Sequence, residues 1–268
     1  MNTEIHLYTG KKGSNPGGKC LVKTPGLEFD AYIKYCPASK LGRRTIFRAS
    51  HQPIYEALSN TLIGNLGLDI PEFYVLLNKH GEVIFTRENE AREENFNDKM
   101  PYYYVSKLVP LSPAVESTGK QEAMAREKLY RDVVMVSDVS NKAQNFRYNP
   151  DRNNITYIDL GCSFVEATNG SLHTSSVKLP DDVKANSKRA ERLKNELVIS
   201  TKEGILPIEQ IINVKGTLDI PTLNPKGKVH LNEILSLDEI EEISKMLKLN
   251  LLNVVKRHKN DPRLFVKS

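Results

Sequence analysis

The spacing of apolar residues changes near residue 110, and this change limits the folds that the chain can adopt. Before it, short apolar runs alternate with polar residues and are bounded by turn residues, which predicts strands. The predicted strands cover 19–23, 30–36, 70–78, 82–86 and 102–109. Pro110 and Pro113 then punctuate the chain, and most later apolar residues recur at helical spacing. The pattern predicts an α+β chain in two lobes, a strand-rich lobe over 1–110 and a helical lobe over 111–268.

Local signals place individual elements within these lobes. Pro53 suits the first turn of a helix, which Gly67 is placed to end. The segments 70–78 and 82–86 are predicted to pair as a β-hairpin around a turn at 79–81. The expected later elements are helices over 121–135, 182–198, 207–212, 237–247 and 249–259, and a hairpin with strands over 146–148 and 155–158.

Composition excludes several classes of protein. The chain has 268 residues, of which 39% are hydrophobic and 26% charged, the balance of a globular protein with a core of its own. No apolar run approaches the roughly 18 residues of a membrane span, and no run near the start resembles a signal peptide. The three cysteines, Cys20, Cys36 and Cys162, form no CxxC pair. We expect small core cysteines in a cytoplasmic protein, with secretion by a dedicated system left open.

The charge pattern is mild. Net charge is +5, and the densest basic segment, 184–194, is interrupted by Glu191. This favours a solvated helix face over a nucleic-acid interface, and it leaves small phosphorylated ligands open. Five of the six histidines do not pair at metal-ligand spacing, so each is interpreted as a surface or loop residue. These five are His51, His80, His173, His230 and His258.

A set of polar residues in a fixed order carries the chemistry of the sequence. In chain order these are the glycine-rich loop residues Gly13, Ser14, Gly17 and Gly18, the strand lysine Lys34, the helix carboxylate Glu56, the polar-segment residues Asp138 and Asn145, and Asp159 at the end of an apolar strand. A glycine-rich backbone can donate N–H groups to phosphates, and a strand lysine held by a helix carboxylate can reach them. Amide and carboxylate oxygens suit magnesium. The order therefore indicates phosphoryl transfer from ATP.

Each of these residues also has a simpler interpretation. The glycines fit a surface turn, and Asp138 could cap a turn. Glu56 lies off the apolar stripe of its helix, so solvent exposure explains it as well as ion pairing does. Lys34 is more informative, because its apolar flanks predict burial that a lone lysine resists.

Two segments resemble the HipA-like kinases, relatives of the phosphatidylinositol 3/4-kinases and distant cousins of the eukaryotic protein kinases. YEALSNTLIGNLGLDIPEFYVL, residues 55–76, is similar to the family's helix-plus-strand segment. NKAQNFRYNPDRNNITYIDLGCSF, residues 141–164, resembles the family's metal-binding hairpin. The resemblance extends over residues 10–170. It implies a two-lobed, protein-kinase-like fold that uses ATP and magnesium to transfer the γ-phosphate to a Ser or Thr hydroxyl of a protein.

The resemblance implies a role for each matching residue. The implied roles are phosphate binding for Gly13, Ser14, Gly17, Gly18 and Lys34, ion pairing with that lysine for Glu56, contact with adenine for 104–109 with Lys107, magnesium binding for Asn145 and Asp159, and orientation of the acceptor hydroxyl for Asp138. In the family the glycine-rich loop can carry an autophosphorylated serine, and Ser14 is the serine here that could take that part.

One spacing departs from the family's pattern. The catalytic Asp of these kinases stands five positions before the metal-binding Asn, and in this chain that position is Ser140, with Asp138 two residues upstream. Either the loop is remodelled so that Asp138 serves, or the chain binds nucleotide without transferring phosphate, as a pseudokinase does.

Two other functions stay open. The same fold could phosphorylate a lipid or small molecule, which the charged stretch 87–99 and the basic residues near Lys188 would suit. The chain could also be a non-enzymatic adaptor. The sequence does not fix the acceptor, the protein partner or the oligomeric state.

Overall fold

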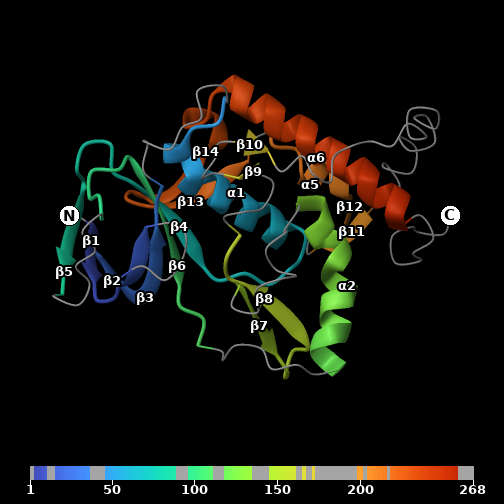
Figure 1. The fold of residues 1–268 in the computed structure, drawn as a ribbon, viewed down its shortest axis with the longest axis horizontal. Helices are drawn as coiled ribbons and strands as arrows, with labels where there is room; N and C mark the ends of the chain where they lie inside the picture. Colours follow the sequence, from blue (N-terminus) through green and yellow to red (C-terminus); the bar gives the residue numbers. More distant parts are fainter. Residues whose placement is uncertain are drawn as a thin grey trace.

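The chain forms a large mixed sheet with helices packed against it (Figure 1). The computed structural model describes residues 3–10, 16–36, 46–88, 96–110, 118–134, 145–160, 165–166, 171–172, 198–201, 204–215 and 218–258. The expected α+β class is confirmed.

The main sheet has eight strands in the order β14-β13-β4-β6-β3-β2-β1-β5. Its strands are β1 (Thr3–Leu7), β2 (Gly17–Thr24), β3 (Leu27–Lys34), β4 (Phe73–Leu77), β5 (Val83–Arg87), β6 (Tyr102–Lys107), β13 (Asp219–Leu223) and β14 (Lys226–His230). Neighbours are antiparallel except for two parallel pairs, β1 with β5 and β4 with β13. The central strands β3 and β6 therefore lie side by side although about 70 residues separate them.

In the described part of the chain, three helices of more than ten residues pack beside this sheet: α1 (Gln52–Asn65), α2 (Thr118–Val134) and α6 (Leu237–His258). In Figure 1, α1 crosses the middle of the molecule, α6 runs along the top, and the hairpin of β7 and β8 lies beside α2. The shorter elements are η2 (Ala49–His51), β7 (Phe146–Asn149), β8 (Asn154–Tyr157), β9 (Val165–Glu166), β10 (Ser171–Leu172), β11 (Val198–Thr201), β12 (Gly204–Pro207), α5 (Ile208–Ile211) and η5 (Leu231–Glu233).

Two apolar clusters cover the two faces of the sheet. The larger cluster joins one face of β4 and β6 to α1, α2 and α6, with Tyr104 and Leu58 among its buried members. The smaller cluster covers the opposite face, where Tyr103 and Ile33 pack under Phe96. Successive residues of β6 thus enter different cores, as the alternation of side chains along a strand requires. Burial on both faces explains why β6 contains five consecutive buried residues.

The predicted hairpin of 70–78 with 82–86 is wrong, although both strands exist. The turn at 79–81 is present, but β4 pairs with β6 and β13, and β5 pairs in parallel with β1 at the far edge of the sheet. Alternation along a strand fixes which face a side chain takes and leaves the partner strand open. Here β6 takes the edge of β4 that a hairpin partner would have used.

The C-terminal half contains strands that the apolar spacing did not predict. β13 and β14 extend the main sheet, so residues from beyond 111 complete it, and β11 and β12 form a separate pair. The helices expected over 237–247 and 249–259 are one helix, α6. Asn250 lies inside it, and its amide donates a 3.2 Å hydrogen bond to the carbonyl of Val133 in α2. Most of the helix expected over 182–198 lies outside the described residues.

Other expectations concern burial. Cys20 and Cys36 are buried, as expected for core cysteines, and Cys162 lies outside the described residues. Among the residues that the structure describes, no helix is both long and apolar enough to cross a membrane.

The close approach of β2 to its neighbours generates a testable prediction. A Cβ atom at Gly18 would lie 2.1 Å from the carbonyl oxygen of Thr9, whereas a Cβ atom at Gly227 in the edge strand β14 would meet nothing within 4 Å. We expect Gly18→Ala to lower the free energy of unfolding by about 1–3 kcal/mol through overpacking. Gly227→Ala is the control and should change it little in urea denaturation. Equal effects of the two substitutions would contradict this account of β2.

Candidate functional site

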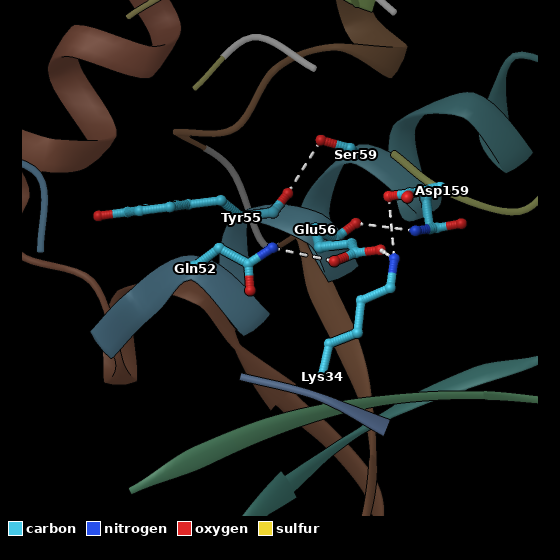
Figure 2. A network of polar contacts seen from close by, with 7 residues as sticks. Lys34, Gln52, Tyr55, Glu56, Ser59 and Asp159 are labelled. Carbon is cyan, nitrogen blue, oxygen red and sulfur yellow. Dashed lines mark hydrogen bonds and ion pairs between the residues drawn. The ribbon is translucent and has the colours of Figure 1, made fainter. Parts of the chain in front are cut away.

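The ammonium of Lys34 bridges two carboxylates that come from distant parts of the chain. Its Nζ lies 2.7 Å from Oε1 of Glu56 and 2.9 Å from Oδ1 of Asp159. Figure 2 shows the lysine reaching up from the sheet to both groups. The structure therefore brings together three of the residues that the sequence singled out, over a separation of up to 125 positions.

Each side chain of the site is positioned by a different element. Lys34 is the last residue of β3, and it stands opposite Tyr104 of β6 in the strand register. Glu56 lies in the second turn of α1. Asp159 follows β8, which is held from two sides: Tyr157 donates its N–H to the carbonyl of Asp69, at 2.9 Å, and its hydroxyl to Glu127 of α2, at 2.8 Å.

Burial differs sharply among the three charged groups. The Glu56 side chain is fully buried, the Lys34 side chain is 11% exposed, and the Asp159 side chain is 45% exposed. Burial by itself lowers the pKa of Lys34, but Glu56 and Asp159 outweigh it and hold that pKa well above its usual range. The lysine is therefore a cation at every physiological pH.

Glu56 has a raised pKa. Burial is the main cause, Lys34 opposes it, and the carboxylate of Asp159 adds to it. Among these three groups, one ammonium faces two carboxylates.

The alternative that Glu56 is a solvent-exposed helix residue is wrong. Its second oxygen, Oε2, accepts a 3.0 Å hydrogen bond from Gln52 one turn earlier, and its backbone carbonyl accepts one from Asn60. The apolar stripe predicted burial of one side of α1 only, whereas every residue over 52–60 is buried. Gln52 and Asn60 are site residues that sequence reasoning missed, although their spacing of four from Glu56 was available as a signal.

The glycine-rich loop ends beside Lys34. Gly17 is paired with Lys34 in the register of β2 and β3, and the N–H of Tyr35 donates to the carbonyl of Pro16 at 3.2 Å. A Cβ atom at Gly17 would lie 2.0 Å from the carbonyl oxygen of Ile33, and its φ of 156° also favours glycine. Gly17 therefore permits the close approach of this loop to β3 beside Lys34, whereas Gly18 permits the approach of β2 to Thr9. Gly13 and Ser14 lie outside the described residues.

The remaining predicted residues divide into three cases. Asn145 precedes β7, and its backbone carbonyl accepts the N–H of Ile158 at 3.0 Å, so it and Asp159 flank the same hairpin. Lys107 is not brought to Lys34: it stacks over Phe29 on the opposite face of the sheet and is ion-paired with Glu72. Asp138 lies outside the described residues.

Two buried side-chain oxygens on residues that contact Glu56 have no hydrogen-bond partner among the described residues, Oε1 of Gln52 and Oδ1 of Asn60. Nδ2 of Asn145, at the start of the hairpin that leads to Asp159, has none there either. Lys34 Nζ lies 5.9 Å from the centre of the Tyr104 ring. Buried polar atoms need a partner, so these atoms are candidates for contact with a bound ligand.

The donor atoms of the site suit magnesium. Asn145 and Asp159 offer amide and carboxylate oxygens, and magnesium is held by one or two such groups when phosphates supply the rest. Within the described part of the chain, no group of three His, Cys, Asp or Glu residues forms a metal site. Asn145 and Asp159 are therefore the residues that would hold magnesium brought by a phosphate ligand.

A second polar cluster at the start of α1 was not foreseen. His51, interpreted from the sequence as a surface or loop residue, is only 5% exposed, and its Nδ1 lies 2.8 Å from Oε1 of Glu239 in α6. The same oxygen accepts the hydroxyl of Tyr55. His51 is buried because α6 covers this end of α1, a contact across 188 positions that no local pattern reveals. His80 and His230 are exposed as expected.

Comparison with known proteins adds no assignment: neither the family models nor the curated proteins searched match this chain.

The buried ion pair should dominate the stability of the site. Lys34→Met leaves the Glu56 carboxylate buried without its cation, and we expect a loss of about 3–5 kcal/mol in the free energy of unfolding. The control is Lys128→Met, which removes an exposed i,i+4 pair with Asp132 and should cost at most about 1 kcal/mol. Adding Glu56→Gln to Lys34→Met should restore part of the loss. A Lys34→Met protein as stable as the control would contradict the buried pairing.

Glu239 makes a separate prediction about acid stability. Burial raises the pKa of its carboxyl, but hydrogen bonds from His51, Tyr55 and the Ser236 N–H outweigh this and lower the pKa from 4.5 to about 2. A lowered folded pKa contributes stability above the unfolded pKa, and that stability is lost as pH falls through the folded pKa. Unfolding free energy should therefore fall between pH 4.5 and about 2. Glu239→Gln should flatten this fall, and Glu241→Gln, exposed on the same helix, should not.

Proposed function

We propose that the chain is a two-lobed, kinase-like protein that binds ATP with magnesium and transfers the γ-phosphate to a Ser or Thr hydroxyl of a protein. The observation that carries this proposal is the bridging of Glu56 and Asp159 by Lys34. Protein kinases place a strand lysine against a helix glutamate and bring a metal-binding aspartate from a later segment to the same point. Here β3, α1 and the segment after β8 supply these three groups in that order.

A buried ion network can also serve stability alone, but three features favour a ligand site. The Asp159 side chain is 45% exposed, so the network opens to solvent on one side. The glycine-rich loop ends opposite Lys34, where its backbone can approach a phosphate. Beside Glu56, the buried Oε1 of Gln52 has no hydrogen-bond partner among the described residues, a cost that a purely structural cluster rarely retains.

The position of each residue suggests its role in the proposed function. Lys34 binds and orients the phosphates, and Glu56 holds the lysine in place. Asn145 and Asp159 would hold magnesium, which neutralises phosphate charge when bound. Asp138 would orient the acceptor hydroxyl. The choice of a protein hydroxyl as acceptor rests on the resemblance to the HipA-like kinases.

A second candidate function is nucleotide binding without phosphoryl transfer. The observation that favours it is Ser140, which stands where these kinases carry their catalytic Asp. A serine hydroxyl cannot act as a carboxylate base. The two candidates share the same nucleotide site and differ only in turnover.

Nucleotide binding can be tested by thermal melting. Magnesium-ATP at a hundredfold excess over its Kd should stabilise the native protein by about 2.7 kcal/mol, because it binds only the folded state. Asp159→Asn should abolish the shift. The control is Asp151→Asn, at the exposed tip of the same hairpin, which should keep it. The absence of any magnesium-dependent shift in the unsubstituted protein would refute the proposed function.

Turnover separates the two candidates. Transfer of labelled γ-phosphate to a protein, or to the chain itself, should be lost in Asp138→Asn while the melting shift with magnesium-ATP remains. Full transfer activity in Asp138→Asn would remove that residue from the mechanism. No transfer from a protein that binds magnesium-ATP would favour the pseudokinase.

A further inference from the structure

Glu239 uses its two carboxylate oxygens for two different tasks. Oε2 accepts the backbone N–H and the hydroxyl of Ser236, both at 2.9 Å, and the N–H of Glu239 returns a 3.3 Å bond to that hydroxyl. This is a capping box that begins α6. Oε1 points to another helix and accepts from His51 Nδ1 and the Tyr55 hydroxyl. We call the contact of Glu239 with His51 and Tyr55 the α1–α6 tie.

Capping of α6 does not require the α1–α6 tie. A capping box works at the protein surface with a solvated carboxylate. The Glu239 side chain is instead fully buried, and burying a carboxylate costs free energy unless donors surround it. The donors that compensate for this burial include His51 at the end of η2 and Tyr55 in α1, which are 188 and 184 positions away in the sequence.

The tie meets α1 next to the proposed nucleotide site. Tyr55 immediately precedes Glu56, and Figure 2 shows the two side chains leaving the helix in different directions, with the Tyr55 ring pointing away from Lys34. α1 is therefore held through Tyr55 on the α6 side and through Glu56 on the lysine side. The buried apolar contacts of α1 are not directional and allow small rotations or shifts along the helix axis. Hydrogen bonds at the adjacent positions Tyr55 and Glu56 fix both the rotation of α1 and its position along its axis.

We propose that Glu239 is a positioning residue that, through the α1–α6 tie, holds α1 where Glu56 meets Lys34 and so couples the C-terminal helix to the nucleotide site. The coupling to nucleotide rests on the proposed function. The coupling to the Lys34–Glu56 pair is independent of the proposed function, because this pair forms in the chain without nucleotide.

The first readout is therefore independent of nucleotide. Competitive acetylation of the full chain with acetic anhydride, read by mass spectrometry, measures how readily the reagent reaches the Lys34 amine. Tyr55→Phe removes the tie's donor on α1, and Glu239→Gln weakens the tie while leaving an amide that can still cap α6. Both should raise Lys34 acetylation about tenfold, because α1 is then free to move and Glu56 no longer keeps the amine buried. Exposed Lys128 serves as the internal reference.

The matched control is Ser236→Ala. It removes the capping hydroxyl at the other oxygen of Glu239 and leaves the donors His51 and Tyr55 in place. It should lower the melting temperature as loss of a helix cap does, without changing Lys34 acetylation. If Ser236→Ala raises acetylation as much as Tyr55→Phe does, or if neither tie variant raises it, the positioning role is overturned.

The second readout is the Kd for magnesium-ATP, measured by calorimetry on the same variants. Displacement of the Lys34–Glu56 pair should weaken binding about tenfold to a hundredfold in Tyr55→Phe and Glu239→Gln and leave Ser236→Ala near the unsubstituted protein. If the unsubstituted chain does not bind magnesium-ATP, the proposed function fails, and acetylation alone decides the tie. Normal affinity in both tie variants would refute the coupling to nucleotide.

Discussion

The burial of Lys34 between two carboxylates is the interaction on which the rest of the arrangement depends. Removing an ammonium and a carboxylate from water costs several kcal/mol each, and only a close, well-donated pair offsets this. The 2.7 Å contact with Glu56 satisfies that condition only if α1 lies at one rotation and one height over β3. Gln52 holds the second oxygen of the same carboxylate, so the polar contacts fix what apolar packing alone would leave adjustable.

The same requirement explains how distant parts of the chain are brought together. Asp159 reaches Lys34 because β8 is held by Asp69 after α1 and by Glu127 of α2. The hairpin of β7 and β8 thus connects both helices to the strand lysine. The tie of α6 to Tyr55 holds α1 from the other side. The ion pair of Lys34 forms only at one relative position of β3, α1 and the β7–β8 hairpin, and these hydrogen bonds hold the elements in that position.

Sequence patterns anticipated the local part of this structure and little of the long-range part. The flanks of Lys34 predicted a lysine in a half-buried strand, and the strand ending in Asp159 was also foreseen, because each depends on a few neighbouring residues. The pairing of β4 with β6 was not foreseen, since an alternating run fits any partner strand equally well. Likewise, Ser236 and Glu239 show the spacing of a capping box, but nothing local shows that the second oxygen of that glutamate faces His51.

The unequal burial of the two carboxylates determines which contact of Lys34 can change. Glu56 has no exposed surface and a second donor, so its pair with Lys34 is the fixed contact. Asp159 is half exposed and follows a hairpin, so exchanging its contact with Lys34 for one with a cation would require no opening of the core. The proposed function needs this asymmetry, because Glu56 has to keep holding the lysine while Asp159 is released to an incoming cation.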